Sequence, residues 1–320
     1  MIWPRRAARR VAAAKARQPG KALAAPGGWV FLVNDTNDFL PWQFGVTRWT
    51  RGERAQVEGV IKARLEALAP TPYLMFITPE KSVAYQEYLP EGLVDLNSDP
   101  SRPATWLAGR FPAQIHYLQP WFERMKRLGF LYFRGDTHVN WLGGYLLYRF
   151  VIETLDAAGL ATRPAITSSE LLPARAGFEG DLFVQLDENQ KPGFDIDADY
   201  ARWRAMLEIT LKYNLDEALV RAKRLALTPE DQTGFHGREM LIYETPDPSL
   251  PRAVVFRDST ATESIPFLAE HFSRSVYVWH DGDVLAEIIR REQPDIVLHF
   301  VAERFLATYP TTVPLNFAAP

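Results

Sequence analysis

Val254-Val255-Phe256-Arg257-Asp258-Ser259 is the stretch that decides the fold, because it runs from an apolar strand into a turn. Ala253 to Phe256 has the length and composition of a buried strand. Asp258 and Ser259 then end the strand with turn-forming side chains. A helical pattern follows, with apolar residues at i, i+3, i+4 and i+7: Ile265, Leu268, Ala269 and Phe272. Ser259 is therefore predicted at the carboxyl end of a strand and just before a helix.

This position of Ser259 has two interpretations. Enzymes built on α/β sheets hold a nucleophile at such a strand-turn-helix junction. The backbone N–H groups at the start of the helix are also free to stabilise an oxyanion. The alternative is that Asp258 or Ser259 only caps the helix. The local pattern alone leaves both interpretations open.

Composition limits the class of protein. The chain has 320 residues, of which 47% are hydrophobic, and its formal net charge is −3. A chain of this length and composition forms a globular core, as one large domain or two. The small negative charge predicts no general affinity for nucleic acid. Because the sequence has no cysteine, disulfides, thiol catalysis and thiolate metal sites are excluded.

The N-terminal residues 1–26 are basic and rich in alanine. We expect them to form a flexible tail or a transient surface helix. The apolar run Val11 to Ala14 is shorter than the core of about 7 residues that a secretory signal requires, and Lys15 follows it. No run of the sequence approaches the ~18 apolar residues of a transmembrane helix. These features predict a protein of the cytoplasm or of the cytoplasmic face of the membrane.

Strands and helices alternate along most of the chain. We expect strands near residues 29–33, 73–77, 130–133, 275–279 and 295–300, and helices near 54–68, 115–125, 141–155 and 284–291. Residues 162–251 are less regular and are predicted to form an insertion, with a helix at Arg202 to Leu211. This alternation indicates a mainly parallel sheet with helices on both faces.

Reactive side chains follow three of the predicted strands: Lys81, the pair Asp136 and His138, and Ser259. In an extended loop, residues two apart point to the same side, so the Asp136 carboxylate can hold the imidazole of His138. The other imidazole nitrogen is then free to take the proton of a serine hydroxyl. The three residues could form a hydrolase-type triad. A purely structural histidine is the alternative. No His-Glu-x-x-His or similar pattern suggests a metal, and we predict neither a metal nor a cofactor.

Several motifs occur in the order found in one known family. The sequence resembles the SGNH-hydrolase-like domain of the AlgX/AlgJ (DHHW) group of bacterial polysaccharide O-acetyltransferases. The matching segments are Gly28 to Leu32, Pro79-Glu80-Lys81 with Tyr85, Tyr88, Leu89 and Pro90, Asp136-Thr137-His138-Val139-Asn140 with Gly143, Gly180-Asp181-Leu182, Arg257-Asp258-Ser259 with Pro266 to Phe272, Pro294 to Val297 and Glu303 to Leu306. Each motif is weak alone, but the ordered set runs from about Gly27 to Leu306.

The resemblance implies a three-layer α/β/α fold with a mainly parallel central sheet, spanning residues 27–320 as one catalytic domain. It implies Ser259 as nucleophile, His138 as base and Asp136 as the carboxylate that orients it. We also assign Lys81, Arg257 and Asn140, which lie in these motifs, to substrate binding; Lys81 could instead order the pocket or be a solvated loop lysine. Val139 replaces the Trp usual in the family, and the family's N-terminal anchor or export signal is not visible. A periplasmic location, as in the family, is the alternative.

The expected function is transfer of an acetyl group, through an ester of Ser259, to a hydroxyl of a bacterial polysaccharide or glycan precursor. The expected partners are a polysaccharide or oligosaccharide acceptor and an acetyl donor, which a membrane acyltransferase could pass on. An esterase with water as acceptor would use the same three residues, and the sequence does not separate the two. A third alternative is a non-catalytic glycan-binding protein that keeps the fold, which the intact Asp136, His138 and Ser259 argue against.

Overall fold

A seven-stranded sheet forms the centre of the molecule. The computed structural model describes residues 2–17, 20–160, 163–186, 207–229, 231, 239–279 and 284–308. The strand order is β4-β3-β11-β9-β10-β8-β7; the first five strands run parallel, β8 is antiparallel to β10, and β7 is antiparallel to β8. Their bounds are β3 Tyr73–Thr78, β4 Ile115–Tyr117, β7 Lys223–Arg224, β8 Met240–Glu244, β9 Arg252–Arg257, β10 Arg274–Trp279 and β11 Ile296–Ala302. The mainly parallel sheet predicted from the sequence is confirmed.

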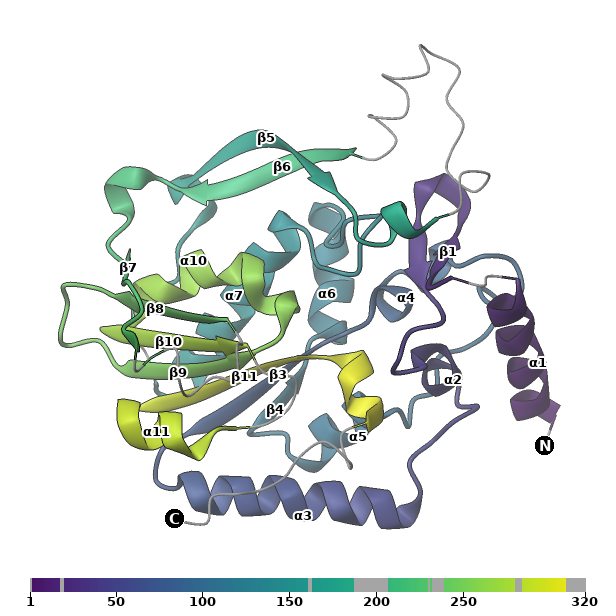
Figure 1. Ribbon diagram of the computed structural model, residues 1–320, viewed down its shortest axis with the longest axis horizontal. Helices are drawn as coiled ribbons and strands as arrows, with labels where there is room; N and C mark the ends of the chain where they lie inside the picture. The colour runs from purple at the N-terminus through teal and green to yellow at the C-terminus, as the bar shows by residue number, and fades with distance from the viewer. Residues whose placement is uncertain are drawn as a thin grey trace.

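Helices cover both faces of this sheet, so the molecule has three layers (Figure 1). One face packs against α6 (Gln119–Met125), α7 (Trp141–Ala157) and α10 (Ile265–Leu268). The other packs against α3 (Arg51–Leu68), α5 (Pro103–Arg110) and α11 (Ala286–Glu292). Strand β9 shows the alternation that this requires, because Val255 belongs to the first core and Val254 and Phe256 to the second. The expected α/β/α arrangement is therefore the observed one.

Two of the long helices begin with side-chain caps that are readable in the sequence. Thr50 and Glu53 form a capping box at the start of α3, where each side chain accepts a hydrogen bond from the other residue's backbone N–H. Asn140 caps α7 by accepting from the N–H of Gly143 at 2.9 Å. Shorter helices are α2 (Phe39–Gln43) and α4 (Lys81–Ala84).

The less regular region contains more strand than expected. Strands β5 (Leu171–Glu179) and β6 (Leu207–Leu215) form an antiparallel pair outside the central sheet (Figure 1). The predicted helix at Arg202 to Leu211 is wrong for Leu207 to Leu211, which belong to β6; residues 202–206 lie outside the described residues. Cross-strand pairing with β5, whose partner residues run from Glu179 for Leu207 to Arg175 for Leu211, overrides the local helical pattern.

Three other local predictions are corrected by pairing partners. Ile115 to Tyr117 is strand β4 and not the start of a helix. Residues 130–133 contribute only an isolated bridge between Tyr132 and Val139. Strand β2 (Val30–Leu32) pairs with β1 (Ala22–Ala24) in a separate two-stranded sheet and not with β3. Short apolar runs do not reveal their partners, so the pattern identified a buried segment without its place.

The N-terminal residues form a helix, which is the second of the two forms that we expected, but one face of it is packed against the protein. Residues Ile2–Ala16 form helix α1, whose Ala7 and Val11 are buried in the core. The guanidinium of Arg10 donates to the carbonyl of Gly92 at 3.1 Å, which fixes the helix to a distant loop. Alanine-rich sequence with apolar residues four apart forms one packing face, and this face finds a partner here. Among the described residues, no helix combines the length and apolarity needed to cross a membrane.

Candidate active site

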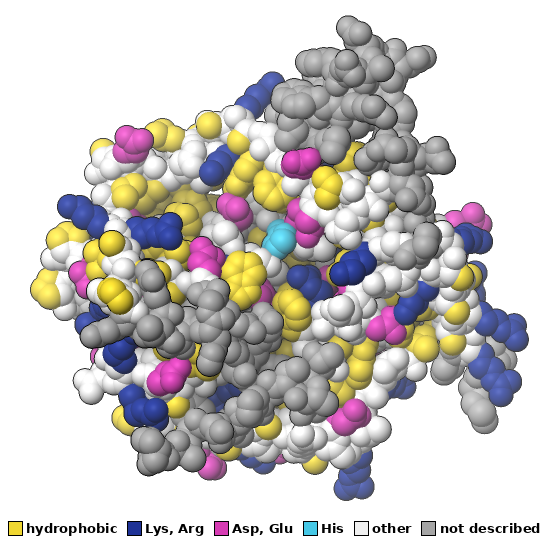
Figure 2. All heavy atoms as spheres, viewed as in Figure 1, with side chains coloured by type: hydrophobic (Ala, Val, Ile, Leu, Met, Phe, Trp, Pro, Cys, Tyr) yellow, Lys and Arg dark blue, Asp and Glu magenta, His cyan; other side chains and the backbone are white. Residues whose placement is uncertain are grey.

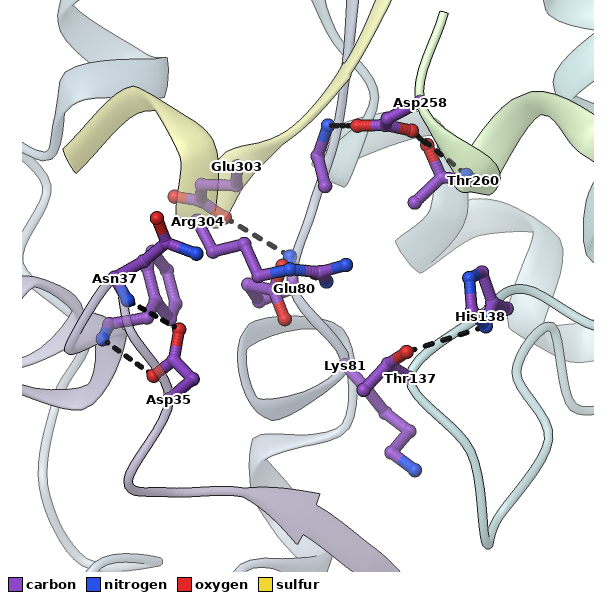
Figure 3. A network of polar contacts seen from close by, with 12 residues as sticks. Asp35, Asn37, Glu80, Lys81, Thr137, His138, Asp258, Thr260, Glu303 and Arg304 are labelled. Atoms are coloured by element: carbon purple, nitrogen blue, oxygen red, sulfur yellow. Dashed lines mark hydrogen bonds and ion pairs between the residues drawn. The ribbon is translucent and has the colours of Figure 1, made fainter. Parts of the chain in front are cut away.

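Three strand ends meet at one edge of the sheet and carry the candidate residues. Strands β3, β11 and β9 are parallel neighbours, with Thr78 beside Ala302 and Phe300 beside Arg257. The residues that follow their carboxyl ends therefore lie at the same edge: Glu80 and Lys81 after β3, Glu303 and Arg304 after β11, and Asp258 and Ser259 after β9. Figure 3 shows these segments around a common space, with His138 on the loop that faces them. On the face shown in Figure 2, a histidine is exposed among acidic and basic side chains.

Asp136 and His138 form the hydrogen-bonded pair predicted from their spacing. Nδ1 of His138 lies 2.5 Å from Oδ1 of Asp136, and the backbone N–H of His138 donates to the same oxygen at 2.8 Å. The Asp136 side chain is 2% exposed and that of His138 is 28% exposed. A carboxylate at Nδ1 fixes the tautomer and turns Nε2 toward solvent, where it can accept a proton.

The electrostatics of this pair suit a base. Burial by itself would lower the pKa of His138, but the hydrogen bond and charge of Asp136 outweigh it and raise that pKa. Burial by itself would raise the pKa of Asp136, but the hydrogen bond and charge of His138 outweigh it and lower that pKa. Each partner stabilises the charged form of the other. Asp136 is therefore ionised at neutral pH and able to stabilise an imidazolium.

Asp181 joins the pair, and its part in the site was not predicted. Its backbone N–H donates to Oδ2 of Asp136 at 2.6 Å, and its carboxylate accepts from the N–H and hydroxyl of Thr137 at 2.8 and 2.7 Å. A side chain at Gly180 would place Cβ 2.1 Å from the carbonyl oxygen of Gly135, so only glycine permits this approach. The Gly180-Asp181-Leu182 motif was the available signal, but without a fold it named no partner.

Lys81 lies beneath the loop that carries this pair. Its ammonium donates to the carbonyls of Phe133 at 3.2 Å and Arg134 at 2.8 Å, and to that of Asp136. Lys81 is 3% exposed, and burial lowers its pKa to about 7. Its three N–H groups are thus engaged with the backbone. Lys81 is not a solvated loop lysine, and its position is that of a residue that orders the pocket.

Ser259 is the first residue of a short 3₁₀ helix, η7 (Ser259–Ser264), and Asp258 is the cap. Oδ1 of Asp258 accepts from the N–H of Thr260 at 2.8 Å, and Oδ2 accepts from the N–H of Ala302 at 2.5 Å. The hydroxyl of Ser259 is partly exposed and makes no hydrogen bond to another described residue. The capping alternative therefore applies to Asp258, which leaves the Ser259 hydroxyl available for chemistry.

Helix α7 joins the two halves of the candidate site. It starts three residues after His138, and its Gly144 lies against η7: a Cβ there would be 2.4 Å from Cβ of Glu263. The charges of His138 and Glu263 interact across this contact, since His138 opposes the rise that burial causes in the pKa of Glu263. No direct hydrogen bond joins His138 to Ser259 among the described residues. The convergence of a complete triad stays a prediction.

Arg257 and Asn140, which we assigned to substrate binding, are buried and bonded to the protein. The guanidinium of Arg257 donates to Glu239 at 2.7 Å and to the hydroxyl of Thr262 at 3.2 Å. The amide of Asn140 donates to the carbonyl of Phe130 at 2.6 Å while its oxygen caps α7. Together with Lys81, they position the segments around the site. The substrate contact that we expected of them stays a prediction, and Nε of Arg257 is a buried donor without a hydrogen-bond partner among the described residues.

Glu80 and Arg304, side by side in Figure 3, complete the edge. Nη1 of Arg304 donates to Oε1 of Glu80 at 2.9 Å, and both residues are buried. The N–H of Glu80 in turn donates to Glu303 at 3.3 Å, and Glu303 pairs with Arg102 at 2.8 Å. The segment Glu80-Lys81 therefore anchors two structures, Arg304 through its carboxylate and the Asp136 loop through its ammonium.

Asp136, His138 and Asp181 are also the residues of this region that could bind a cation, since their candidate ligand atoms all lie within 4.8 Å of one another. Their geometry does not favour one. Nδ1 of His138 already contacts Asp136, and the Asp181 carboxylate accepts two hydrogen bonds from Thr137. A metal would have to replace these bonds. The absence of a metal stays a prediction.

The sheet order and the three layers are those of the α/β/α, SGNH-hydrolase-like fold that the sequence resemblance implies. No protein-family model and no curated protein matches the chain. Among solved structures, it is similar to PatB1 of Bacillus cereus, with 17% identity, 89% of this chain and 96% of that chain covered, and a TM-score of 0.62.

Two further structures have the same fold. The O-acetyltransferase domain of Pseudomonas putida AlgJ has 15% identity, 94% of this chain and 96% of that chain covered, and a TM-score of 0.57. A DHHW family protein from Eubacterium siraeum has 16% identity, coverage of 92% and 96%, and a TM-score of 0.58. The structural neighbours thus include the group that the sequence motifs resemble. At these identities the likeness is one of fold.

Proposed function

We propose that the protein is an O-acetyltransferase that moves an acetyl group, through an ester of Ser259, to a hydroxyl of a bacterial polysaccharide or glycan precursor. One observation carries the proposal: a hydrogen-bonded Asp136–His138 pair is tied to the end of β3, at the same edge of the sheet where β9 leads into Ser259, whose hydroxyl has no hydrogen-bond partner among the described residues. The fold likeness to the O-acetyltransferase domain of Pseudomonas putida AlgJ supports the acetyl part, and the resemblance of the sequence motifs to polysaccharide O-acetyltransferases supports the glycan part. The location of the present protein in the cell, cytoplasmic or periplasmic, stays a prediction.

The first half-reaction forms the acyl-enzyme. Ser259 Oγ attacks the carbonyl carbon of the donor ester while Nε2 of His138 takes the hydroxyl proton, directly or through one water. The tetrahedral oxyanion collapses, the donor alkoxide leaves, and it receives the proton from His138. Asp136 stabilises the imidazolium in between, which its lowered pKa permits.

The second half-reaction transfers the acetyl group. Neutral His138 takes the proton of an acceptor hydroxyl, and that oxygen attacks the acetyl-serine. Collapse of the second oxyanion frees Ser259, which takes the proton back from His138. Water at the acceptor position would make the protein an esterase, so the enzyme must favour a sugar hydroxyl over water.

A trapping experiment tests the proposal. The protein is mixed with 4-nitrophenyl acetate, quenched in acid and digested. The mass of the peptide that contains Ser259 is then measured by mass spectrometry. We expect one added acetyl group on Ser259 and faster loss of it when oligosaccharides are present, with acetylated sugar as the product. If the rate of acetyl loss is the same with and without every oligosaccharide tested, the protein is an esterase. A lack of adduct and of turnover would support the non-catalytic alternative.

A further inference from the structure

Arg304 has more hydrogen-bond donors than partners. Its side chain is 10% exposed, it donates to Glu80 through Nη1, and its guanidinium lies over the ring of Phe305 at 4.8 Å. Stacking leaves the N–H groups in the guanidinium plane free. Those that do not face Glu80 make no hydrogen bond to another residue that the structure describes. Because the side chain is partly open to solvent, its unused donors can pair with water or with a ligand.

The free side of Arg304 faces the reaction centre. In Figure 3 its side chain extends from η9 (Glu303–Thr308) into the space between the Asp258–Thr260 segment and His138. The charges agree with this placement. Burial lowers the pKa of Arg304, but the carboxylates of Glu80 and then Asp258 outweigh it and raise that pKa. The pKa of His138 is lowered by burial and, to a smaller extent, by the positive charge of Arg304. The larger effect of Asp136 raises it overall.

The location of Arg304 is fixed by the sheet. Strand β11 pairs with β9, and the carboxylate of Asp258 accepts from the N–H of Ala302 at the end of β11. Arg304 is two residues beyond Ala302, and Ser259 is the residue after Asp258. The same bond therefore holds together the two backbone segments that carry the nucleophile and Arg304, and Glu80 holds the guanidinium.

We infer that Arg304 donates hydrogen bonds to the carbonyl oxygen of the acyl group as that oxygen becomes negative. The inference deepens the proposed function and rests on it. When Ser259 Oγ bonds to the carbonyl carbon, the C=O π pair moves onto the oxygen, and His138 holds the serine proton. The N–H of Ser259, at the start of η7, is one donor to this oxyanion, and Arg304 is the second. On collapse the pair returns to the C=O bond and the leaving oxygen takes the proton from His138.

A neutral substrate separates this role from recognition of an acidic sugar. We would measure kcat and KM for 4-nitrophenyl acetate, which carries no carboxylate, with wild type, Arg304→Gln and Arg304→Lys. Loss of an oxyanion donor lowers kcat by about 10²-fold or more and changes KM little. Arg304→Lys keeps the charge but not the planar fork, so we expect a smaller loss of about 10-fold.

A pH profile excludes an indirect effect. If Arg304 acted only by lowering the pKa of His138, Arg304→Gln would move the rise of activity to higher pH and leave the plateau rate unchanged. We expect the plateau itself to fall. Arg274→Gln is the matched control, because Arg274 is a partly buried, ion-paired arginine at the opposite ends of the parallel strands. It should keep the wild-type rate.

Two outcomes have different meanings. A wild-type plateau rate in folded Arg304→Gln, while Ser259→Ala is inactive, would overturn the role of Arg304 and leave the proposed function intact. Activity of Ser259→Ala would overturn the proposed function itself. If Arg304→Gln does not fold, as judged by circular dichroism, Arg304→Lys decides: an unchanged kcat would contradict the inference, and a fall with unchanged KM supports it.

Discussion

The loop of residues 133–138 and the turn of residues 257–262 carry the two halves of the candidate site, but they are held in different ways. The turn has bonds within itself, since Asp258 caps Thr260 and Arg257 donates to Thr262, and it is also held by Ala302, whose N–H donates to Asp258. The loop is held by residues 44 to 74 positions away in the sequence, namely Lys81, Asp181 and Glu208. The candidate nucleophile therefore lies on a turn that is partly local, while the loop of the base takes these three anchors from distant parts of the chain.

The largest expected effect is on chemistry and not on either support. Ser259→Ala should lower kcat/KM for an activated ester by about 10⁴-fold or more, because no other group replaces the nucleophile. The unfolding free energy should change by less than about 1 kcal/mol, since the hydroxyl has no described partner. Ester turnover and urea unfolding measure the two quantities. Ser273→Ala, at another turn, is the control; normal turnover by Ser259→Ala would reject the nucleophile.

Lys81→Met should damage the loop from a distance. It removes the donor of three backbone carbonyls, those of Phe133, Arg134 and Asp136, and leaves them buried. We expect a loss of about 2–4 kcal/mol in unfolding free energy, together with lower catalysis. Lys62→Met, at an exposed lysine of α3, should cost far less. Equal stability of the two variants in urea would contradict distant support of the loop.

The same variant has a distinct pH dependence. Burial lowers the pKa of Lys81 from 10.5 to about 7 in the folded protein. Between these values the unfolded chain binds more protons than the folded one, so Lys81 makes the stability of the wild type rise with pH. Below about pH 7 Lys81 is protonated in both states, and the folded protein bears the full cost of burying its charge. Lys81→Met should lack this rise. Unfolding free energies measured from pH 6 to 10 would show parallel curves if Lys81 did not titrate in this range.

Asp258→Asn tests the local half of the comparison. The two oxygens of Asp258 accept from the N–H groups of Thr260 and Ala302, and the amide of Asn has only one oxygen. Its NH₂ group would therefore oppose one of these two donors, and that hydrogen bond would be lost. We expect a loss of about 1–3 kcal/mol in unfolding free energy. Asp247→Asn is the matched control, because Asp247 makes the same i to i+2 bond, to the N–H of Ser249, at an exposed turn. A cost no larger than that of Asp247→Asn would show that the turn does not need Asp258.

Asp181→Asn should have the smallest effect, a shift in pH dependence. Burial lowers and Asp136 raises the pKa of His138, and the Asp181 carboxylate adds to the rise. Removing this charge should lower the pKa of His138, so that the rise of activity moves to lower pH by less than about one unit. Asparagine can still accept the hydrogen bond from Thr137. A nuclear magnetic resonance titration of His138 gives the sign, and a shift to higher pH would contradict it.

Much of the fold could be predicted because its signals are local. Val254 to Phe256 is a buried apolar run, and 141–155 is a helical one, so β9 and α7 appear where expected. The pairing of short runs could not be predicted, and residues 115–117, 130–133 and 207–211 were misassigned for that reason. A strand is defined by the partner that completes its hydrogen bonds, and the partner lies elsewhere in the chain.

The candidate site divides in the same way. The sequence by itself indicated the Asp136–His138 pair, because residues two apart in an extended loop point to the same side, and it placed Ser259 after a strand. Only the tertiary structure decided that Lys81 bonds three carbonyls, that Asp181 joins Asp136, and that Arg304 faces the reaction centre. A buried charge must find its partners in three dimensions, and chain folding brings them from strands far apart in the sequence.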